Sequence, residues 1–557
     1  MARGIRLRRL SSGLAVLAFV GVLGYLVVLP LIRLQVTAFE GGALGYRTAY
    51  GAPGTVSILV TTVALGVGSL IVALVLGTLL AWAAFHLPPR YWMLRMLPVI
   101  PIVIPSVANV VGWTFLFSPR PGYLNALLRL LPWWSDLESG PVDIYTVPWI
   151  ILLTGFLLTS FVYLFANSGL QNISRDHIDA AQVSGSSPAG VFFKVILPLL
   201  RPALIYGSGV VLLLGLGQFT VPLLLGTNLG IKVITTEMYS YVSESPLDFA
   251  AATALGSPLV LFGLAIVVLQ RLGLGDQTRF VTHGGTAFQP SRRPSKIAVA
   301  GILLYGLVST ILPIVGLTLV ALSRFWSGSL SPSLFTLDNL STVLTGPDTT
   351  NAIITSVAAS AAAVAIVLPV GFIAATLLLR ARRFRPGRAL LDFIVTLPLG
   401  IPAVVFGVGF LLTYTYPPLI LYGSRWVIVL VYVTLMLPFG TRMLLSSMIS
   451  LGDGYLEASR VSGANAFTTN VRIVLPLLRT AVGGATALMF VLLTHEFSAS
   501  LLVRAPTVQV MGTVLFDYWT NGSYPTVAAI ALVMTAVTGL GVAAAMTIGG
   551  RDVLEKL

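Results

Sequence analysis

A histidine and a glutamate, His495 and Glu496, lie next to each other in an otherwise apolar stretch. The segment 495–498 (HEFS) has a counterpart 278 residues earlier, 217–220 (GQFT). Ionisable groups at membrane depth cost about 3 kcal/mol each and usually face a cavity, water or a polar partner. The pair therefore predicts either the lining or gate of a path through a membrane, or a buried cluster of structural hydrogen bonds. On a continuous helix the two side chains would point about 100° apart. The candidate path residues are Gln218, Phe219, Thr220, His495, Glu496, Phe497 and Ser498.

Catalytic and metal-binding chemistry find little support in the sequence. The chain has no cysteine, which excludes thiolate metal sites, cysteine nucleophiles and disulfides. The four histidines are scattered, without a ligand spacing such as H-x-x-x-H; they are His86, His177, His283 and His495. A P-loop needs G-x-x-x-x-G-K-[ST], and none of the four lysines follows a glycine. We therefore expect no catalytic residue, no metal site and no cofactor bound by this chain.

The composition identifies the elements that carry these residues. Of the 557 residues, 56% are hydrophobic and only 9% are charged, whereas a soluble chain has about a quarter charged residues. The sequence therefore predicts an all-α membrane protein. A span needs about 20 apolar residues of helix, and about twelve such stretches occur. They are Leu14–Ile32, Ile58–Phe85, Met96–Phe117, Val147–Leu164, Ala203–Leu225, Ala250–Leu269, Ile297–Leu322, Ala352–Leu379, Leu390–Leu412, Trp426–Leu445, Ala481–Leu502 and Val527–Ile548.

The basic residues indicate how the spans are oriented. With a cytoplasmic N-terminus, 25 of the 33 Lys and Arg residues fall in the loops on that side. Cytoplasmic loops carry such an excess, so we expect both termini in the cytoplasm and a location in a cytoplasmic-type membrane. Because the net charge of +14 is spread over thin loops, nucleic-acid binding is not expected. One alternative is that the first apolar run is a cleaved signal peptide, although it is long for one.

The sequence repeats itself at a constant separation. Residues 179–185 (DAAQVSG) match 457–463 (EASRVSG), and 195–201 (VILPLLR) match 473–479 (IVLPLLR), each 278 residues apart. Since six expected spans separate the copies, both copies have the same orientation in the membrane. We expect two pseudo-symmetric six-span domains joined by a cytoplasmic linker. The boundaries are 1–271, 272–296 and 297–557, with the repeated loops near 175–201 and 453–479.

A second pair of matching segments contains prolines. Ile104-Pro105 and Gly112 match Ile401-Pro402 and Gly409 with the same internal spacing. Their separation of 297 residues places extra sequence in an outer loop of the first half, at 118–146. Proline interrupts helices, so the third and ninth spans should be broken, either to bend around neighbours or to expose carbonyls to a path. The prolines concerned are Pro98, Pro101, Pro105, Pro398 and Pro402.

Each copy of the first repeat predicts a short helix-turn-helix that protrudes from the membrane. The acidic residue that opens it can cap or complement the start of a short helix. The small residues that follow allow another surface to approach closely. Gly185 and Gly463 can adopt the positive φ of a tight turn, and Pro198 and Pro476 suit the first turn of the next helix. A protruding loop that occurs at the same place in both halves is suited to bind a partner.

The repeated segments resemble the EAA loop, E-A-A-x3-G-x9-I-x-L-P, of the permease subunits of ABC importers. Residues 179–198 and 457–476 fit its spacing, and the departures are Asp179, Val195 and Ser459. Both halves are similar to type I permease domains, and a chain with two of them is similar to the fused permeases of the ferric iron and thiamine groups. The matching residues are Asp179, Ala180, Ala181, Gly185, Leu197, Pro198, Glu457, Ala458, Ser459, Gly463, Leu475 and Pro476.

The resemblance implies partners outside this chain. Each EAA loop would form a coupling helix that docks in a groove of a separate ATPase subunit, so two copies of an ABC ATPase would bind on the cytoplasmic face. ATP and Mg²⁺ would be bound by those subunits. A substrate-binding protein would deliver cargo on the outer face, and the lipid of the bacterial plasma (inner) membrane would surround the spans. By this resemblance the chain is a permease and not an enzyme.

The substrate and one different class of transporter stay open. Ferric iron is favoured because the fused form and the Phe-containing segments look most like that group, while thiamine, polyamine and phosphonate are alternatives. A hard cation would be handled by oxygen ligands. The other class is an ion-coupled secondary transporter, in which His495 and Glu496 would relay protons and the repeated loops would only connect spans.

Overall fold

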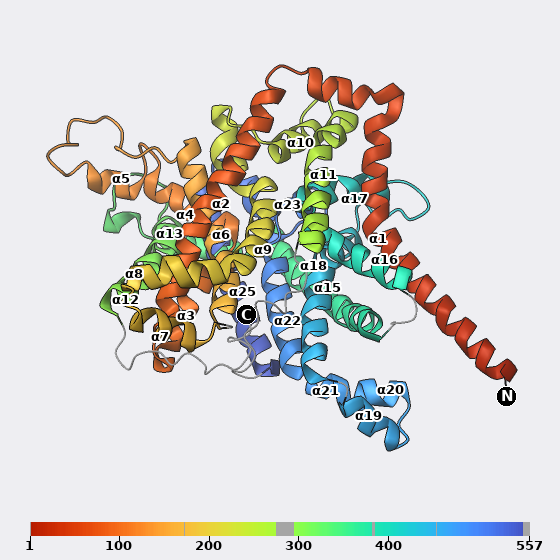
Figure 1. Ribbon diagram of the computed structural model, residues 1–557. Helices are drawn as coiled ribbons and strands as arrows, with labels where there is room; N and C mark the ends of the chain where they lie inside the picture. Colours follow the sequence, from red (N-terminus) through yellow and green to blue (C-terminus); the bar gives the residue numbers. More distant parts are fainter. Residues whose placement is uncertain (1, 172, 274–294, 381–384, 453, 550–557) are drawn as a thin grey trace.

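The computed structural model describes residues 2–171, 173–273, 295–380, 385–452 and 454–549, and most of these are helical (Figure 1). The first half contains α1 (Ala2–Gly51), α2 (Thr55–Phe85), α3 (Trp92–Met96), α4 (Ser106–Phe117), α5 (Tyr123–Leu128), α6 (Val147–Gln171), α7 (Arg175–Val183), α8 (Pro188–Val191), α9 (Leu197–Leu216), α10 (Ile234–Ser243) and α11 (Phe249–Gly273). The second half contains α12 (Lys296–Gly306), α13 (Leu312–Ala321), α14 (Asp338–Thr345), α15 (Pro347–Arg380), α16 (Arg385–Thr396), α17 (Ala403–Tyr414), α18 (Arg425–Leu451), α19 (Gly454–Val461), α20 (Ala466–Thr469), α21 (Leu475–Leu477), α22 (Arg479–Thr494), α23 (Ser498–Val503), α24 (Met511–Thr520) and α25 (Tyr524–Gly549). The expected linker at 272–296 lies largely outside the described residues.

The predicted all-α membrane fold is confirmed. Among the described residues, nine helices are long and apolar enough to cross a membrane, and three bent helix pairs bring the number of spans to as many as twelve. β-structure in this part of the chain consists of two isolated bridges. The bent pairs are Trp92–Ile102 with Ser106–Phe117 (92°), Pro386–Leu399 with Ala403–Tyr414 (109°), and Phe467–Leu477 with Arg479–Thr494 (71°).

Prolines explain the first two bends, as the sequence predicts. Pro105 and Pro402 stand directly before α4 and α17 with φ/ψ of −52°/131° and −57°/145°, outside the helical region. Proline donates no hydrogen bond and disfavours a helical conformation at the residue before it. Pro98 and Pro101 lie in a 3₁₀ turn before the first bend, and Pro398 lies in one before the second. The matching Ile-Pro pairs therefore mark equivalent bends in the two halves.

The first span of each half, α1 and Lys296–Ala321, packs against the other half. α1 contacts α17, and α13 contacts α4. At these crossings the backbones touch, because a Cβ added to Gly112 would lie 2.3 Å from the carbonyl oxygen of Pro313, and one added to Gly409 would lie 2.8 Å from that of Pro30. Only glycine permits so close an approach. This explains why both copies of the repeat have glycine there.

Replacing Gly112 and Gly409 together with valine should destabilise the folded protein. Overpacking of a close crossing costs about 1–3 kcal/mol per site, so we expect a clearly lower melting temperature for the purified protein in detergent. The matched control is Gly21→Val with Gly301→Val, on α1 and α12, where an added Cβ meets nothing within 4 Å. Equal melting temperatures for the two double variants would contradict the close crossing.

Candidate functional site

The two EAA-like segments fold alike and lie at the same end of the molecule. The first runs from α7 through a turn at Gly185 to α8, and the second from α19 through a turn at Gly463 to α20. Figure 1 shows α7 and the α19–α20 pair in the lower part of the molecule, with α10 near the top. A partner can therefore reach both segments from one side of the membrane.

The turn after the first helix has the same hydrogen bonds in both copies. Gly185 has φ +82° and donates its N–H to the carbonyl of Gln182 (2.9 Å), while Ser186 donates to Ala181 (3.0 Å). In the second copy Gly463 has φ +77°, and the equivalent bonds measure 3.0 and 3.1 Å. This pair of bonds is the Schellman motif, which closes a helix through a residue with left-handed backbone. The predicted glycine turn is confirmed in both halves.

The acidic residues of the motif differ in their place on the helix. Ser174 caps α7, since its hydroxyl accepts from the N–H of Asp176. α7 therefore begins four residues before Asp179, and the expectation that Asp179 caps or complements the helix start is wrong. In the second copy Glu457 does lie in the first turn of α19, where a carboxylate is favourable to the helix dipole.

The two small residues after each acid have different surroundings. Ala180 and Ala458 are exposed, which suits close approach by a partner. Ala181 packs instead against the apolar cluster that contains Val191 of α8. Ser459 is buried in the second copy, and its hydroxyl lies 2.7 Å from that of Thr469 in α20. The departure from the EAA pattern at Ser459 thus replaces an apolar contact between the two short helices with a hydrogen bond.

An exposed valine marks each turn, and the sequence analysis did not single it out. Val183 and Val461 are both 90% exposed and occupy equivalent positions, two residues before the turn glycine. Their signal in the sequence is the repeated V-S-G. An apolar side chain held this far out at the same place in both halves is typical of a contact surface.

The Leu-Pro pair of the first half lies inside a long helical segment, whereas that of the second half lies just before the 71° bend. A π turn precedes each pair, at Phe192–Ile196 and Asn470–Val474. Pro198 and Pro476 follow within the first two residues of α9 and α21, as the sequence predicts. The wider π turn gives room where the proline cannot donate to the preceding turn. Consequently α8 and α9 form a single membrane-crossing segment, Ala189–Leu216.

The candidate path residues lie where two spans are interrupted. α9 ends at Leu216 and α22 ends at Thr494, and in both halves the next three residues are non-helical. His495 and Glu496 are therefore not on a helix, and the predicted 100° separation is wrong. The helix is interrupted here because the Glu496 carboxylate accepts hydrogen bonds from the backbone N–H groups of Ala499 (2.8 Å) and Ser500 (2.9 Å) and so caps α23.

The remaining polar groups at the breaks are partly satisfied. The Thr154 hydroxyl donates to the side-chain oxygen of Gln218, and the Thr235 hydroxyl donates to its backbone carbonyl. Nε2 of Gln218 and Nδ1 of His495 are buried and have no hydrogen-bond partner within the described residues. Buried polar groups are rarely left without partners, so these two nitrogens, one at each break, are able to bind water or a polar solute.

Aromatic rings from both halves meet beside the breaks. Phe219 and Phe497 stack with ring centroids 5.7 Å apart, although they are 278 residues apart in the sequence. Tyr239 of α10 and Phe516 of α24 lie 5.7 Å from Phe219 and Phe497 respectively, and 6.2 Å from each other. We call these four residues the aromatic cluster. Thr220 is buried beside it, and Ser498 is the first residue of α23.

Equivalent short helices hold the outer two rings. The N–H of Ile234 at the start of α10 donates to Thr62 (2.9 Å), and that of Met511 at the start of α24 donates to Ser356 (2.8 Å). Each helix is also flanked by an ion pair, Lys232–Glu237 (2.8 Å) in the first half and Arg504–Asp517 (2.7 Å) in the second. The hydrogen bond with Glu237 raises the pKa of the Lys232 ammonium group. The two helices correspond in the repeat, but their ion pairs are formed by different residue types, Lys–Glu in the first half and Arg–Asp in the second.

This fold defines a helical membrane protein of the transporter class, with two similar halves that share a central aromatic contact and present paired segments to one side. Residues 73–272 and 368–551 both match the family described as "Binding-protein-dependent transport system inner membrane component". The chain belongs to this family. It is therefore a multi-pass permease subunit of a binding-protein-dependent ABC transport system, and the resemblance noted in the sequence is confirmed.

Three relatives illustrate the range of the family. The chain is 28% identical to the probable ABC transporter permease protein y4fN of Sinorhizobium fredii, covering 86% of this chain and 85% of that protein. It is 26% identical to the putative ferric transport system permease protein FbpB 1 of Haemophilus influenzae, over 74% of this chain but only 65% of that protein. It is 26% identical to the spermidine/putrescine transport system permease protein PotB of Escherichia coli, over 36% of this chain and 70% of that protein.

Proposed function

We propose that this chain is the fused permease of a ferric iron ABC importer and that two separate ATPase subunits drive it. The duplicated turn at Gly185 and Gly463, presented at the same end of the molecule, supports the coupling role, and the similarity to a ferric transport system permease supports the substrate. Each segment would dock one ATPase subunit, and ATP with Mg²⁺ would be bound there. A substrate-binding protein would dock on the α10 side, at the outer face.

The coupling segment and the aromatic cluster are connected through one helix in the first half. Ala189–Leu216 contains 28 residues, which is about 42 Å of helix from the exposed turn to the break before Phe219. Movement of the coupling segment would be transmitted along this helix and would separate Phe219 from Phe497. We infer that the aromatic cluster closes the translocation path and that Gln218, Thr220, His495, Glu496 and Ser498 line it nearby.

Replacing both turn glycines with valine should uncouple the permease from its ATPase. A β-branched residue is strongly disfavoured at positive φ, so the Schellman turns would open and the coupling helices would shift. We expect Gly185→Val with Gly463→Val to insert in the membrane normally but to retain less than about a tenth of the ATPase in co-purification. The matched control is Gly185→Asn with Gly463→Asn, because asparagine tolerates this backbone conformation. Normal ATPase binding by the valine variant would overturn the coupling role.

The substrate is tested with the binding protein of the same system. We expect it to bind ferric iron and to discriminate against spermidine and thiamine, in a direct titration of the purified protein. The similarity to a spermidine/putrescine permease makes polyamine the second candidate substrate, and tight polyamine binding by the binding protein would favour it.

Reconstitution in liposomes distinguishes an ABC importer from an ion-coupled secondary transporter. The permease should be inactive without ATPase and ATP. Transport by the permease alone under a proton gradient would favour the ion-coupled secondary transporter.

A further inference from the structure

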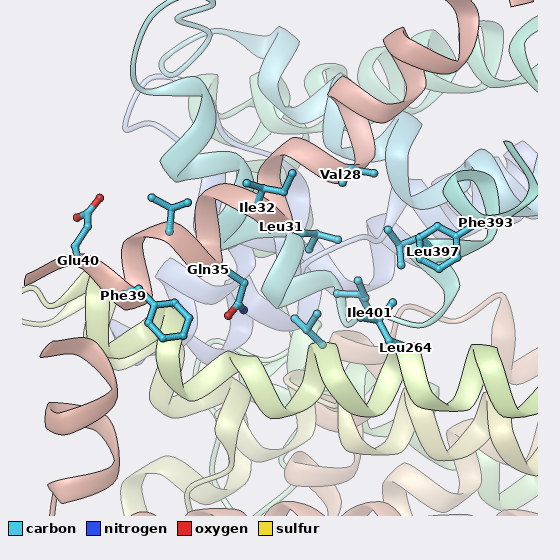
Figure 2. Close-up of a pocket in the computed structure, with 12 residues that line it drawn as sticks. Val28, Leu31, Ile32, Gln35, Phe39, Glu40, Leu264, Phe393, Leu397 and Ile401 are labelled. Atoms are coloured by element: carbon cyan, nitrogen blue, oxygen red, sulfur yellow. The ribbon is translucent and has the colours of Figure 1, made fainter. Parts of the chain in front are cut away.

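An apolar groove of about 710 Å³ that shares no lining residue with the aromatic cluster lies between helices of the two halves (Figure 2). α1 provides one wall from Val28 to Glu40, α11 contributes Val260 and Leu264, and the segment from α16 to Ile401 completes it. Its volume lies within the range of small-molecule sites. Figure 2 shows Phe39 and Glu40 at one end and Phe393 at the other.

We propose that this groove binds the acyl chain of a membrane phospholipid whose headgroup carries an amine, phosphatidylethanolamine being the probe. Two of the walls belong to helices that are long and apolar enough to cross a membrane, Val16–Gly51 and Phe249–Leu269, so an acyl chain is the apolar partner available to the groove. Along α1 the wall from Val28 to Glu40 rises about 18 Å. This length matches one leaflet, which is half of a hydrocarbon core about 30 Å thick.

The lining leaves one charged group for the headgroup. Gln35 is the other polar residue of the wall, but its amide already bonds to Ser257 (3.1 Å) and Tyr46 (3.0 Å). Glu40 is exposed, and within the described residues its carboxylate forms no ion pair. The helical conformation of α1 stops at Glu40, where Gly41, Gly42 and Ala43 have positive φ. At the end of an apolar wall one leaflet long, this carboxylate would lie near the headgroups, where it could pair with an ammonium group.

A lipid in this groove would also join the two halves. Ile401 lines the groove, and the next residue, Pro402, packs on Gly217, whose added Cβ would lie 2.6 Å from the proline ring. Gly217 begins the break that leads to Phe219. Because a void beside these residues would forfeit dispersion contacts, an acyl chain there would support the packing of α1 and α11 against the second half. Bound lipid is therefore expected to raise the melting temperature.

The test is native mass spectrometry of the full-length protein, delipidated and then titrated with phosphatidylethanolamine. Val36→Trp should fill the groove and reduce the bound lipid at least about five-fold, since Val36 lines it and is 49% exposed. Val22→Trp is the matched control on the same helix, 66% exposed and outside the groove, and should bind like the unmodified protein. Equal lipid binding by both variants would overturn the site. If the unmodified protein instead formed a dimer that Val36→Trp abolished, the occupant of the groove would be a second copy of this chain and not a lipid.

The headgroup is tested separately. Glu40→Gln should weaken phosphatidylethanolamine binding about two- to five-fold, the strength of a partly exposed ion pair, and should leave binding of phosphatidylglycerol unchanged or stronger. An unchanged preference for phosphatidylethanolamine in this variant would overturn the role of Glu40. Tighter binding of phosphatidylglycerol than of phosphatidylethanolamine by the unmodified protein would overturn the amine headgroup.

Discussion

Replacement of both Val183 and Val461 with aspartate is expected to abolish ATPase binding while leaving the permease folded. Each valine is 90% exposed, so its removal loses almost no packing within the chain. In the complex these side chains would enter the partner's docking groove, where a buried contact contributes about 2 kcal/mol or more. A loss of about 2 kcal/mol at each segment corresponds to about a 30-fold weaker contact with each ATPase subunit. The measurement is co-purification of the ATPase and its ATP hydrolysis in reconstituted vesicles.

The control for this prediction is a similar charge on an exposed apolar residue elsewhere. Leu337→Asp alters a side chain that is 68% exposed, in the loop before α14, and should leave ATPase binding intact. The single variants Val183→Asp and Val461→Asp should each retain one docking segment and show intermediate binding. Normal co-purification with the double variant would place the ATPase contact elsewhere on the chain.

Features that depend on local chemistry were predictable from the sequence. The turns at Gly185 and Gly463 follow from glycine's access to positive φ, and the bends at Pro105 and Pro402 follow from the missing N–H of proline. These effects act within a few residues of the amino acid that causes them. The twelve apolar stretches likewise follow from the thickness of a membrane.

Two features of the candidate site were not predicted, one a helix cap within a single segment and the other a contact between the two halves. No residue in HEFS forbids a helix, yet the span stops there because Glu496 caps the helix that begins at Ser498. Glutamate is not among the residues that favour the N-cap, so the sequence held no standard signal for this cap. The stacking of Phe219 on Phe497 had no local signal other than their equivalent places in the repeat, because it depends on how the two halves meet.

Chemical crosslinking of position 219 to position 497 is expected to stop transport reversibly. The chain contains no cysteine, so Phe219→Cys with Phe497→Cys introduces the only two thiols. The native rings lie 5.7 Å apart, which a short bifunctional thiol reagent can span. If the aromatic cluster must open to pass the substrate, the crosslinked permease should transport at least about twenty-fold more slowly and should recover when a cleavable linker is reduced. ATPase binding should persist, because the coupling segments are unchanged.

The single variants Phe219→Cys and Phe497→Cys control for the cost of losing a buried ring, which is about 3–5 kcal/mol for truncation to alanine. Each single variant should react with the reagent, and its transport rate should be the same before and after treatment.

The double variant Phe219→Leu with Phe497→Leu keeps an apolar contact and should insert normally. It should close the path less tightly and raise the ATP-independent leak of small ions. Continued transport by a fully crosslinked protein would show that the path does not run between these two rings, and an absence of crosslinking would show that the rings do not meet.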